Sequence, residues 1–97
     1  MITRIVRLSF EEQHIDTFLQ VFEETKEDIR SFDGCQYLEL MQDHDHLNVY
    51  YTHSKWTSDE ALQRYRHSLL FQNTWLRTKV LFNAKPLAYS LKSVLVV

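Results

Sequence analysis

The fold of this chain is decided by the stretch Lys55-Trp56-Thr57-Ser58-Asp59-Glu60-Ala61-Leu62-Gln63-Arg64-Tyr65-Arg66-His67-Ser68, which runs on through Phe71 to Trp75. A strand that ends at Trp56 is expected to pass directly into a helix. Thr57 is the predicted N-cap of that helix, because Glu60 follows three residues later, as in a capping box. Both tryptophans of the chain lie in this stretch, which therefore also predicts a pocket.

Length and composition set the broad class of the protein. Its 97 residues predict one domain, residues 1–97. A net charge of −2 gives no electrostatic reason to expect nucleic-acid binding. Cys35 is the single cysteine, so no intramolecular disulfide forms and a reducing compartment is expected. Arg4 and Arg7 interrupt the apolar start, and no apolar run reaches the roughly 20 residues of a membrane helix. We therefore expect a cytoplasmic protein without membrane contact.

The hydrophobic periodicity predicts six elements in the order strand, helix, strand, strand, helix, strand. The strands are expected at 2–8, 35–42, 47–55 and 87–96. Ser9 with Glu12 predicts the start of the first helix by a capping box, and Gly34 predicts a left-handed cap after it. The apolar stripe of that helix is Ile15, Phe18, Leu19, Phe22 and Ile29. The second helix is expected to bend near residues 68–70. This order is the α+β ferredoxin-like βαββαβ plan with an antiparallel sheet.

Several predicted strands carry apolar side chains on both faces. Ile5 opposes Val6, and in the last strand Leu91 and Leu95 oppose Val94 and Val96. In this plan the helices cover only one face of the sheet. A second copy of the chain is the simplest cover for the other face, so we predict a homodimer.

A wider pattern contains this stretch: Trp56-Thr57-Ser58-Asp59-Glu60-Ala61-Leu62, then Tyr65, Ser68, Phe71 and Trp75, and finally Pro86-Leu87-Ala88. In this pattern the chain resembles the antibiotic biosynthesis monooxygenase-like family over nearly its whole length. The resemblance implies a single ferredoxin-like domain that pairs into a dimeric α+β barrel. Members of the family include cofactor-free quinone-forming oxygenases, haem-degrading enzymes, signal-molecule isomerases and proteins of no known activity.

The chain departs from the haem-degrading members at two positions. Those members carry a histidine ligand a turn and a half beyond the Ser-x-x-Phe segment, where this chain has Trp75. They also use an asparagine in the first strand, and residues 2–10 contain none. We therefore predict no tight haem binding and no bound cofactor. Trp56 does match the tryptophan that lines the pocket in several members.

The candidate ligand-binding residues are Trp56, Tyr65, Phe71 and Trp75. Each has an alternative as a core aromatic side chain. The candidate catalytic residues are His53 and His67, because a cofactor-free oxygenase needs a base that works near neutral pH.

The alternative for each histidine is a merely hydrogen-bonded side chain. His53 shares a strand face with Val49 and Tyr51. If that face meets the helices, His53 adjoins the pocket. If it meets a partner subunit, His53 is an interface residue.

The remaining sequence motifs do not predict a catalytic or ligand-binding site. Asp43-His44-Asp45-His46 holds ligand-type side chains but lacks the spacing of a metal motif, so a polar hairpin turn is expected and no metal site. The basic cluster is expected to be a solvated helix face. It consists of Arg64, Arg66, Arg77 and Lys79. A single glycine excludes a dinucleotide-binding loop.

Two functions remain open from the sequence. The first is a cofactor-independent monooxygenase, an oxidoreductase, or a related small enzyme that acts on an aromatic or other apolar small molecule. The second is a non-catalytic dimer that binds a small ligand or serves as a stress-related α/β-barrel protein. A closed cavity reached by a histidine would favour the enzyme, whereas a cavity filled by Trp56, Phe71 and Trp75 would favour the second.

Overall fold

The computed structural model describes all residues, 1–97, as a sheet layer and a helix layer. The elements are β1 (Ile2–Ser9), the short 3-10 helix η1 (Glu12–His14), α1 (Ile15–Arg30), β2 (Cys35–Gln42), β3 (Val49–Trp56), α2 (Asp59–Arg66), α3 (Leu69–Lys79) and β4 (Leu87–Leu91). The strands form one antiparallel sheet in the order β2-β3-β1-β4. The predicted ferredoxin-like plan is therefore confirmed.

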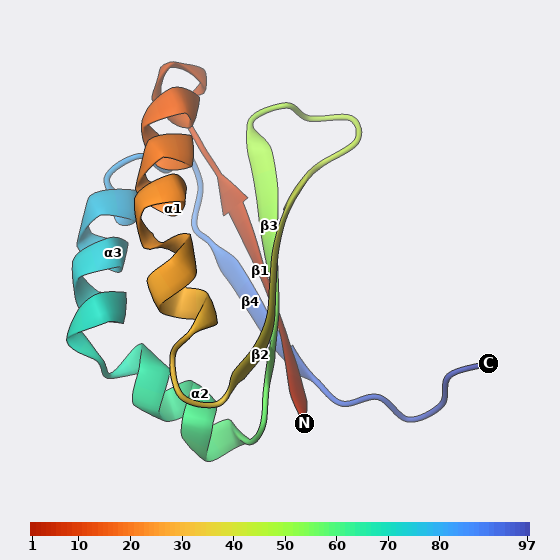
Figure 1. Ribbon diagram of the computed structural model, residues 1–97. Coiled ribbons are helices and arrows are strands. Elements are labelled where there is room, and N and C mark those ends of the chain that lie inside the picture. The colour runs from red at the N-terminus through yellow and green to blue at the C-terminus, as the bar shows by residue number, and fades with distance from the viewer.

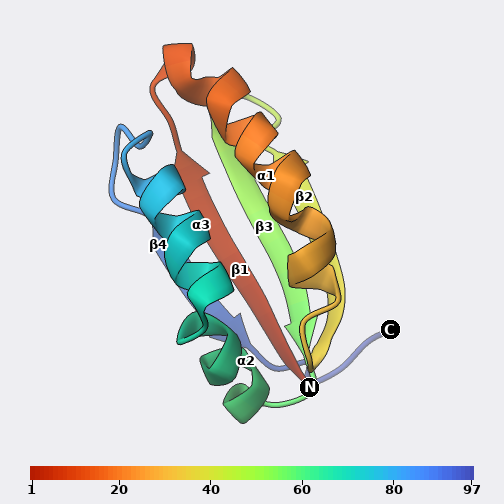
Figure 2. The same ribbon diagram turned by 60° about the vertical axis from the view of Figure 1, so that its left-hand side comes forward.

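The helices all lie on one face of the sheet and leave the other face open (Figure 1). Figure 2 shows α1 and α3 side by side in front of the sheet, with their axes running roughly along β1 and β3. None of these helices combines the length and the apolar character that a membrane crossing requires.

Phe10 decides how the chain leaves β1. Its side chain is fully buried, and it forms an isolated bridge with Phe82. The backbone stays extended through Glu11, and η1 starts only after it. The hydroxyl of Ser9 donates to Asn83 Oδ1 at 2.6 Å and caps no helix. The predicted capping box of Ser9 and Glu12 is therefore wrong, because burial of Phe10 outweighs the local capping preference.

The main core lies between α1 and the part of the sheet that contains Leu8 and Tyr50. Phe18 of α1 stacks on Phe10 with ring centroids 4.2 Å apart and also contacts Tyr50 of β3. The buried face of α1 is Phe18, Val21, Thr25 and Ile29. The predicted stripe also included Leu19, which is 37% exposed. One residue along an α-helix is a rotation of about 100°, so Leu19 lies beside the buried face that contains Phe18.

Gly34 joins α1 to β2 and has a φ of +93°, so the predicted left-handed conformation is confirmed. It does not cap α1 directly, because that helix ends at Arg30. A Cβ at Gly34 would lie 2.5 Å from the Cβ of Ala61, and the Gly34 carbonyl accepts from the N–H of Thr57 at 2.9 Å. The glycine thus lets the start of β2 approach α2 closely.

Two serines cap the helices that follow β3. Ser58, and not the predicted Thr57, is the N-cap of α2, since its side chain accepts from the N–H of Ala61 at 3.1 Å. The backbone of Thr57 is still tied to β2 through its bond to Gly34, which moves the helix start by one residue. Ser68 accepts from the N–H of Phe71 and caps α3. The predicted bend near residues 68–70 is confirmed.

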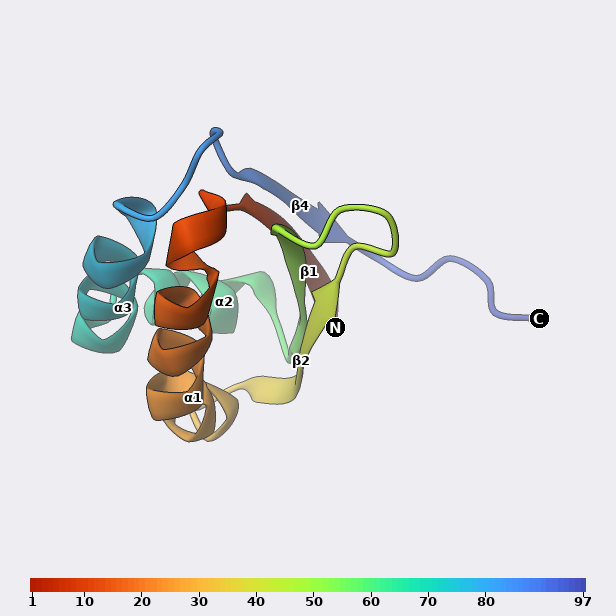
Figure 3. The ribbon, with the colours of Figure 1, turned by 90° about the horizontal axis from the view of Figure 1, so that it is seen from above.

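The last strand is shorter than predicted. β4 ends at Leu91, whereas the sequence predicted a strand to Val96. Leu91 pairs with Thr3, near the start of β1, and beyond it the chain has no neighbouring strand to pair with. The residues after Leu91 leave the body on the open side of the sheet (Figures 1 and 3). Four of them are highly exposed and apolar: Val94, Leu95, Val96 and Val97.

The strand register assigns every side chain to one of the two faces. Residues directly opposite each other in neighbouring strands share a face. Arg4 lies opposite Ser54 and Ser90, and this row faces the helices. Ile5 lies opposite His53 and Tyr89, and this row is on the open face.

Candidate functional site

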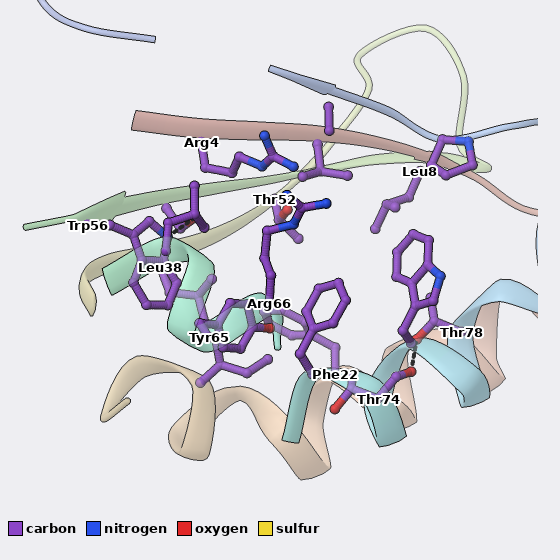
Figure 4. A pocket seen from close by; sticks show the side chains of 18 of the residues that line it. Arg4, Leu8, Phe22, Leu38, Thr52, Trp56, Tyr65, Arg66, Thr74 and Thr78 are labelled. Atoms are coloured by element: carbon purple, nitrogen blue, oxygen red, sulfur yellow. Dashed lines mark hydrogen bonds between the residues drawn. The ribbon is translucent and has the colours of Figure 1, made fainter. Parts of the chain in front are cut away.

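A cavity of about 350 Å³ lies between the sheet and the helices. Its volume is within the range of small-molecule sites. The sheet provides one wall, through residues that include Val6, Leu8, Leu38, Thr52, Ser54 and Ala88, and all three α-helices contribute to the other. Most of the lining is apolar, with a few polar groups among it (Figure 4). Such a cavity suits a small, mainly apolar ligand.

An aromatic wall of four rings lines this cavity: Trp56, Tyr65, Phe71 and Trp75. Trp56 stacks on Tyr65 with ring centroids 4.9 Å apart. Tyr65 meets Phe71 edge-on at 5.3 Å, and Phe71 lies nearly parallel to Trp75 at 5.8 Å. The structure therefore brings together all four predicted ligand-binding residues. Their role as ligand contacts stays a prediction.

Trp56 is at once a core residue and part of the cavity wall. Its side chain is 1% exposed and belongs to a buried cluster with Cys35, Ala61 and Leu62. The indole Nε1–H donates to Ser54 Oγ at 3.0 Å, which satisfies its single polar group. Trp56 is therefore both a buried core residue and a residue of the cavity lining.

The two candidate catalytic histidines lie outside the cavity lining. His53 is on the open face of the sheet, where its Nδ1 is 3.8 Å from Glu39 Oε1 and its ring contacts the edge of Tyr37. His67 is exposed at the end of α2, and its Nδ1 lies 2.7 Å from the carbonyl oxygen of Gln63. The structure does not bring the two histidines together. Their catalytic role stays a prediction, and their location outside the cavity does not support it.

Two arginines line the cavity and were not among the predicted site residues. Arg4 comes from β1 and Arg66 from the last turn of α2. A signal for each was present in the sequence. Arg4 lies two residues before Val6, so the two side chains share the apolar face of their strand. Arg66 lies four residues after the buried Leu62, on the same side of its helix.

The electrostatics of the cavity depend on burial. Burial lowers the pKa of Arg4, the charge of Arg66 lowers it further, and Asp59 partly offsets both. The Arg4 guanidinium nevertheless stays protonated in the physiological range. Burial raises the pKa of Tyr65, with a smaller contribution from Cys35. Tyr65 therefore presents a neutral hydroxyl, and the cavity carries positive charge.

The remaining polar motifs have structural roles. Asp43 Oδ2 accepts from the backbone N–H groups of Asp45 and His46, so the polar hairpin turn folds around it. No three potential ligands among His, Cys, Asp and Glu side chains gather anywhere in the chain. In the basic cluster, Arg64 pairs with Asp33 and Arg77 with Glu24.

Comparison with known proteins connects this cavity to a family. Residues 1–75 match the family model described as Antibiotic biosynthesis monooxygenase. The chain belongs to this family. No curated protein matches it significantly.

Solved structures share the fold of this family member at low identity. A crystal structure of an antibiotic biosynthesis monooxygenase is 17% identical with a TM-score of 0.91, covering 97% of this chain and 99% of its own. A Caulobacter crescentus protein described provisionally by the same name is 18% identical with a TM-score of 0.90, at 96% and 89% coverage. A conserved protein from Methanosarcina mazei is 12% identical with a TM-score of 0.90, at 97% and 94% coverage. These likenesses establish the fold of the chain.

Haem added to the purified protein is expected to be removed by desalting, with no Soret band left. The cavity lining contains no histidine or cysteine, and the raised pKa of Tyr65 disfavours the tyrosinate form that could bind iron. The measurement is the absorption spectrum before and after desalting. A Soret band that persists, and that disappears in a His67→Ala variant, would contradict the prediction.

Proposed function

We propose that this protein is a small oxygenase that acts, as a homodimer and without a bound cofactor, on a flat aromatic or otherwise apolar molecule. The observation that carries the proposal is the cavity of about 350 Å³ along the aromatic wall. Each ring of the aromatic wall contacts the next one, and the cavity lies beside them. Flat rings stack well on such a surface, and membership of the monooxygenase family supports oxygen as the second reactant.

The chemistry requires a substrate that gives electrons to oxygen directly. An ionised phenol or enol can do this, because its negative charge makes it a good electron donor. If a ring CH₂ group is converted to a carbonyl, one atom of O₂ enters the product and the other leaves as water. If a quinol is merely oxidised, its two hydrogen atoms pass to O₂ and form hydrogen peroxide. The two outcomes can be distinguished by product analysis.

The open face of the sheet supports the homodimer. Leu87, Tyr89 and Leu91 are about half exposed there, and Ile5 and Tyr51 lie on the same face. A second copy would cover these side chains, and it would also offer the apolar residues 94–97 a surface to pack on.

The alternative is a non-catalytic dimer that binds the same kind of ligand. The observation that favours it is the position of His53 and His67, both outside the cavity lining. Without either histidine, the cavity has no side chain that takes up protons near neutral pH. The same cavity could then serve as a binding site alone.

The test is a screen of polycyclic phenols and quinols for oxygen uptake, with labelled O₂ and a peroxide assay to identify the products. Ala84 and Ala88 are both exposed, but only Ala88 lines the cavity. Ala88→Trp is therefore expected to abolish uptake, with Ala84→Trp as the matched control that retains it. Ligands that bind without any uptake would support the non-catalytic alternative.

A double variant, His53→Ala with His67→Ala, tests the role of the histidines separately. Uptake at the wild-type rate is expected, because neither side chain lines the cavity. A large loss with ligand binding unchanged would restore one of them as the base.

A further inference from the structure

Two arginine side chains from different elements line the cavity. Arg4 is half-buried on β1, and Arg66 is an exposed residue of α2. Figure 4 shows Arg66 extending from the helical side toward the sheet, which carries Arg4. Two guanidinium groups from separate elements thus line one mainly apolar space, near enough for the charge of Arg66 to act on Arg4.

Neither guanidinium has a carboxylate partner. The ion pairs of the chain involve other residues, including Arg64 with Asp33 and Arg77 with Glu24. Arg4 Nη1 donates to the hydroxyl of Ser90 at 2.9 Å, and Arg66 Nη1 donates to Gln63 Oε1 at 3.3 Å. A guanidinium has five N–H donors, so most donors of both groups remain free for a ligand.

The two guanidinium groups carry like charges that act on each other. Arg66 acts on Arg4 as a like charge, and Asp59 is the one nearby carboxylate that opposes it. The lining contains no other charged residue. An anion between the two guanidinium groups would be attracted by both and would offset their mutual repulsion.

We infer that the ligand of this cavity is a flat aromatic molecule with an anionic oxygen group, which binds between Arg4 and Arg66 while its rings contact the aromatic wall. The inference rests on the proposed function and narrows its substrate class. The anionic group is either a carboxylate or an ionised phenol or enol, both of which accept paired N–H bonds from arginine.

This assignment also explains how the cavity works without a histidine. Opposite charge within a few ångströms favours the ionised form of an acid. A phenol or enol whose oxygen lies between Arg4 and Arg66 therefore loses its proton to water more readily than it does in solution. The arginines replace a base by stabilising the anion that reacts with oxygen.

The first experiment compares 2-naphthoate with the neutral 2-naphthamide by isothermal titration calorimetry. The two molecules have nearly the same shape and differ in charge. Naphthoate is expected to bind about tenfold more tightly, as for charge-assisted hydrogen bonds. Arg4→Gln and Arg66→Gln should each remove most of this preference and weaken naphthamide binding less, because its uncharged amide oxygen accepts weaker hydrogen bonds. Arg64→Gln, on the same helix but outside the cavity lining, is the matched control that retains it.

The second experiment identifies the source of the anionic oxygen. 4-Nitro-1-naphthol changes its visible spectrum when it ionises, so its apparent pKa can be measured with and without protein. Binding to the wild-type protein is expected to lower that pKa, and binding to Arg66→Gln to lower it less. A preference for naphthoate without this shift assigns a carboxylate ligand, whereas the shift assigns a phenol or enol.

The outcomes separate the inference from the proposed function. If naphthoate and naphthamide bind equally and the nitronaphthol pKa does not move, the cavity binds aromatics without using the arginines, and the inference is overturned alone. If neither compound binds, the proposed function fails and the inference fails with it. Should Arg4→Gln not fold, Arg66→Gln decides, because Arg66 is exposed and contributes little to the core.

Discussion

Trp56→Ala is expected to lower the free energy of unfolding by about 3–5 kcal/mol, the usual cost of truncating a large buried aromatic side chain. Trp56 is 1% exposed, stacks on Tyr65 and packs with Ala61 and Leu62. Its removal enlarges the cavity and leaves Ser54 Oγ without its indole donor. Urea unfolding followed by circular dichroism measures the change, and ligand binding is expected to be lost as well.

Trp75→Ala is the comparison for this variant. Trp75 is also part of the aromatic wall, but it is only half-buried. It should therefore weaken ligand binding with a smaller loss of stability. The interpretation of Trp56 as a core residue would be wrong if Trp56→Ala abolished binding and left the unfolding midpoint nearly unchanged.

Ile5→Lys is expected to convert a homodimer into a folded monomer. Ile5 lies at the centre of the open face, between His53 and Tyr89 on the neighbouring strands. An interface that covers this face would bury on the order of 2,000 Å² or more in total. A lysine at its centre would be an unpaired buried charge in the dimer and a solvated side chain in the monomer. Light scattering at micromolar concentration gives the mass of each variant.

Leu69→Lys is the matched control, because Leu69 is 74% exposed on the helical side of the molecule. This variant should keep the mass of the wild-type protein. If the wild-type protein itself is a monomer at micromolar concentration, the proposed dimer is refuted, and a cover for the open face has to be sought elsewhere.

Local sequence patterns sufficed to predict the order of elements and the aromatic wall. Phe71 and Trp75 are four residues apart, so their common side could be predicted from periodicity. Tyr65 lies on the preceding helix, and the bend at Ser68 brings it to Phe71. The bend at Ser68 and the left-handed Gly34 were also local, since each depends on the conformational preference of a single residue.

Exact boundaries depended on contacts between distant residues. Ser9 has the sequence context of a helix cap, yet the burial of Phe10 against Phe18 keeps the chain extended there. Thr57 and Ser58 are both good caps, and the bond from Thr57 to Gly34 selects Ser58. Capping preferences are worth about 1 kcal/mol, which is less than the burial of an aromatic ring.

The amino-acid order alone determined that this chain alternates strands and helices around a tryptophan junction, because those preferences act between near neighbours. Only the tertiary structure decided which face of the sheet His53 occupies and that Arg4 and Arg66 line the same cavity. Strand alternation divides side chains into two sets, and the pairing of β1 with β3 and the placement of all three α-helices on one side determine which set faces the cavity. That choice moved His53 out of the candidate site and brought two arginines into it.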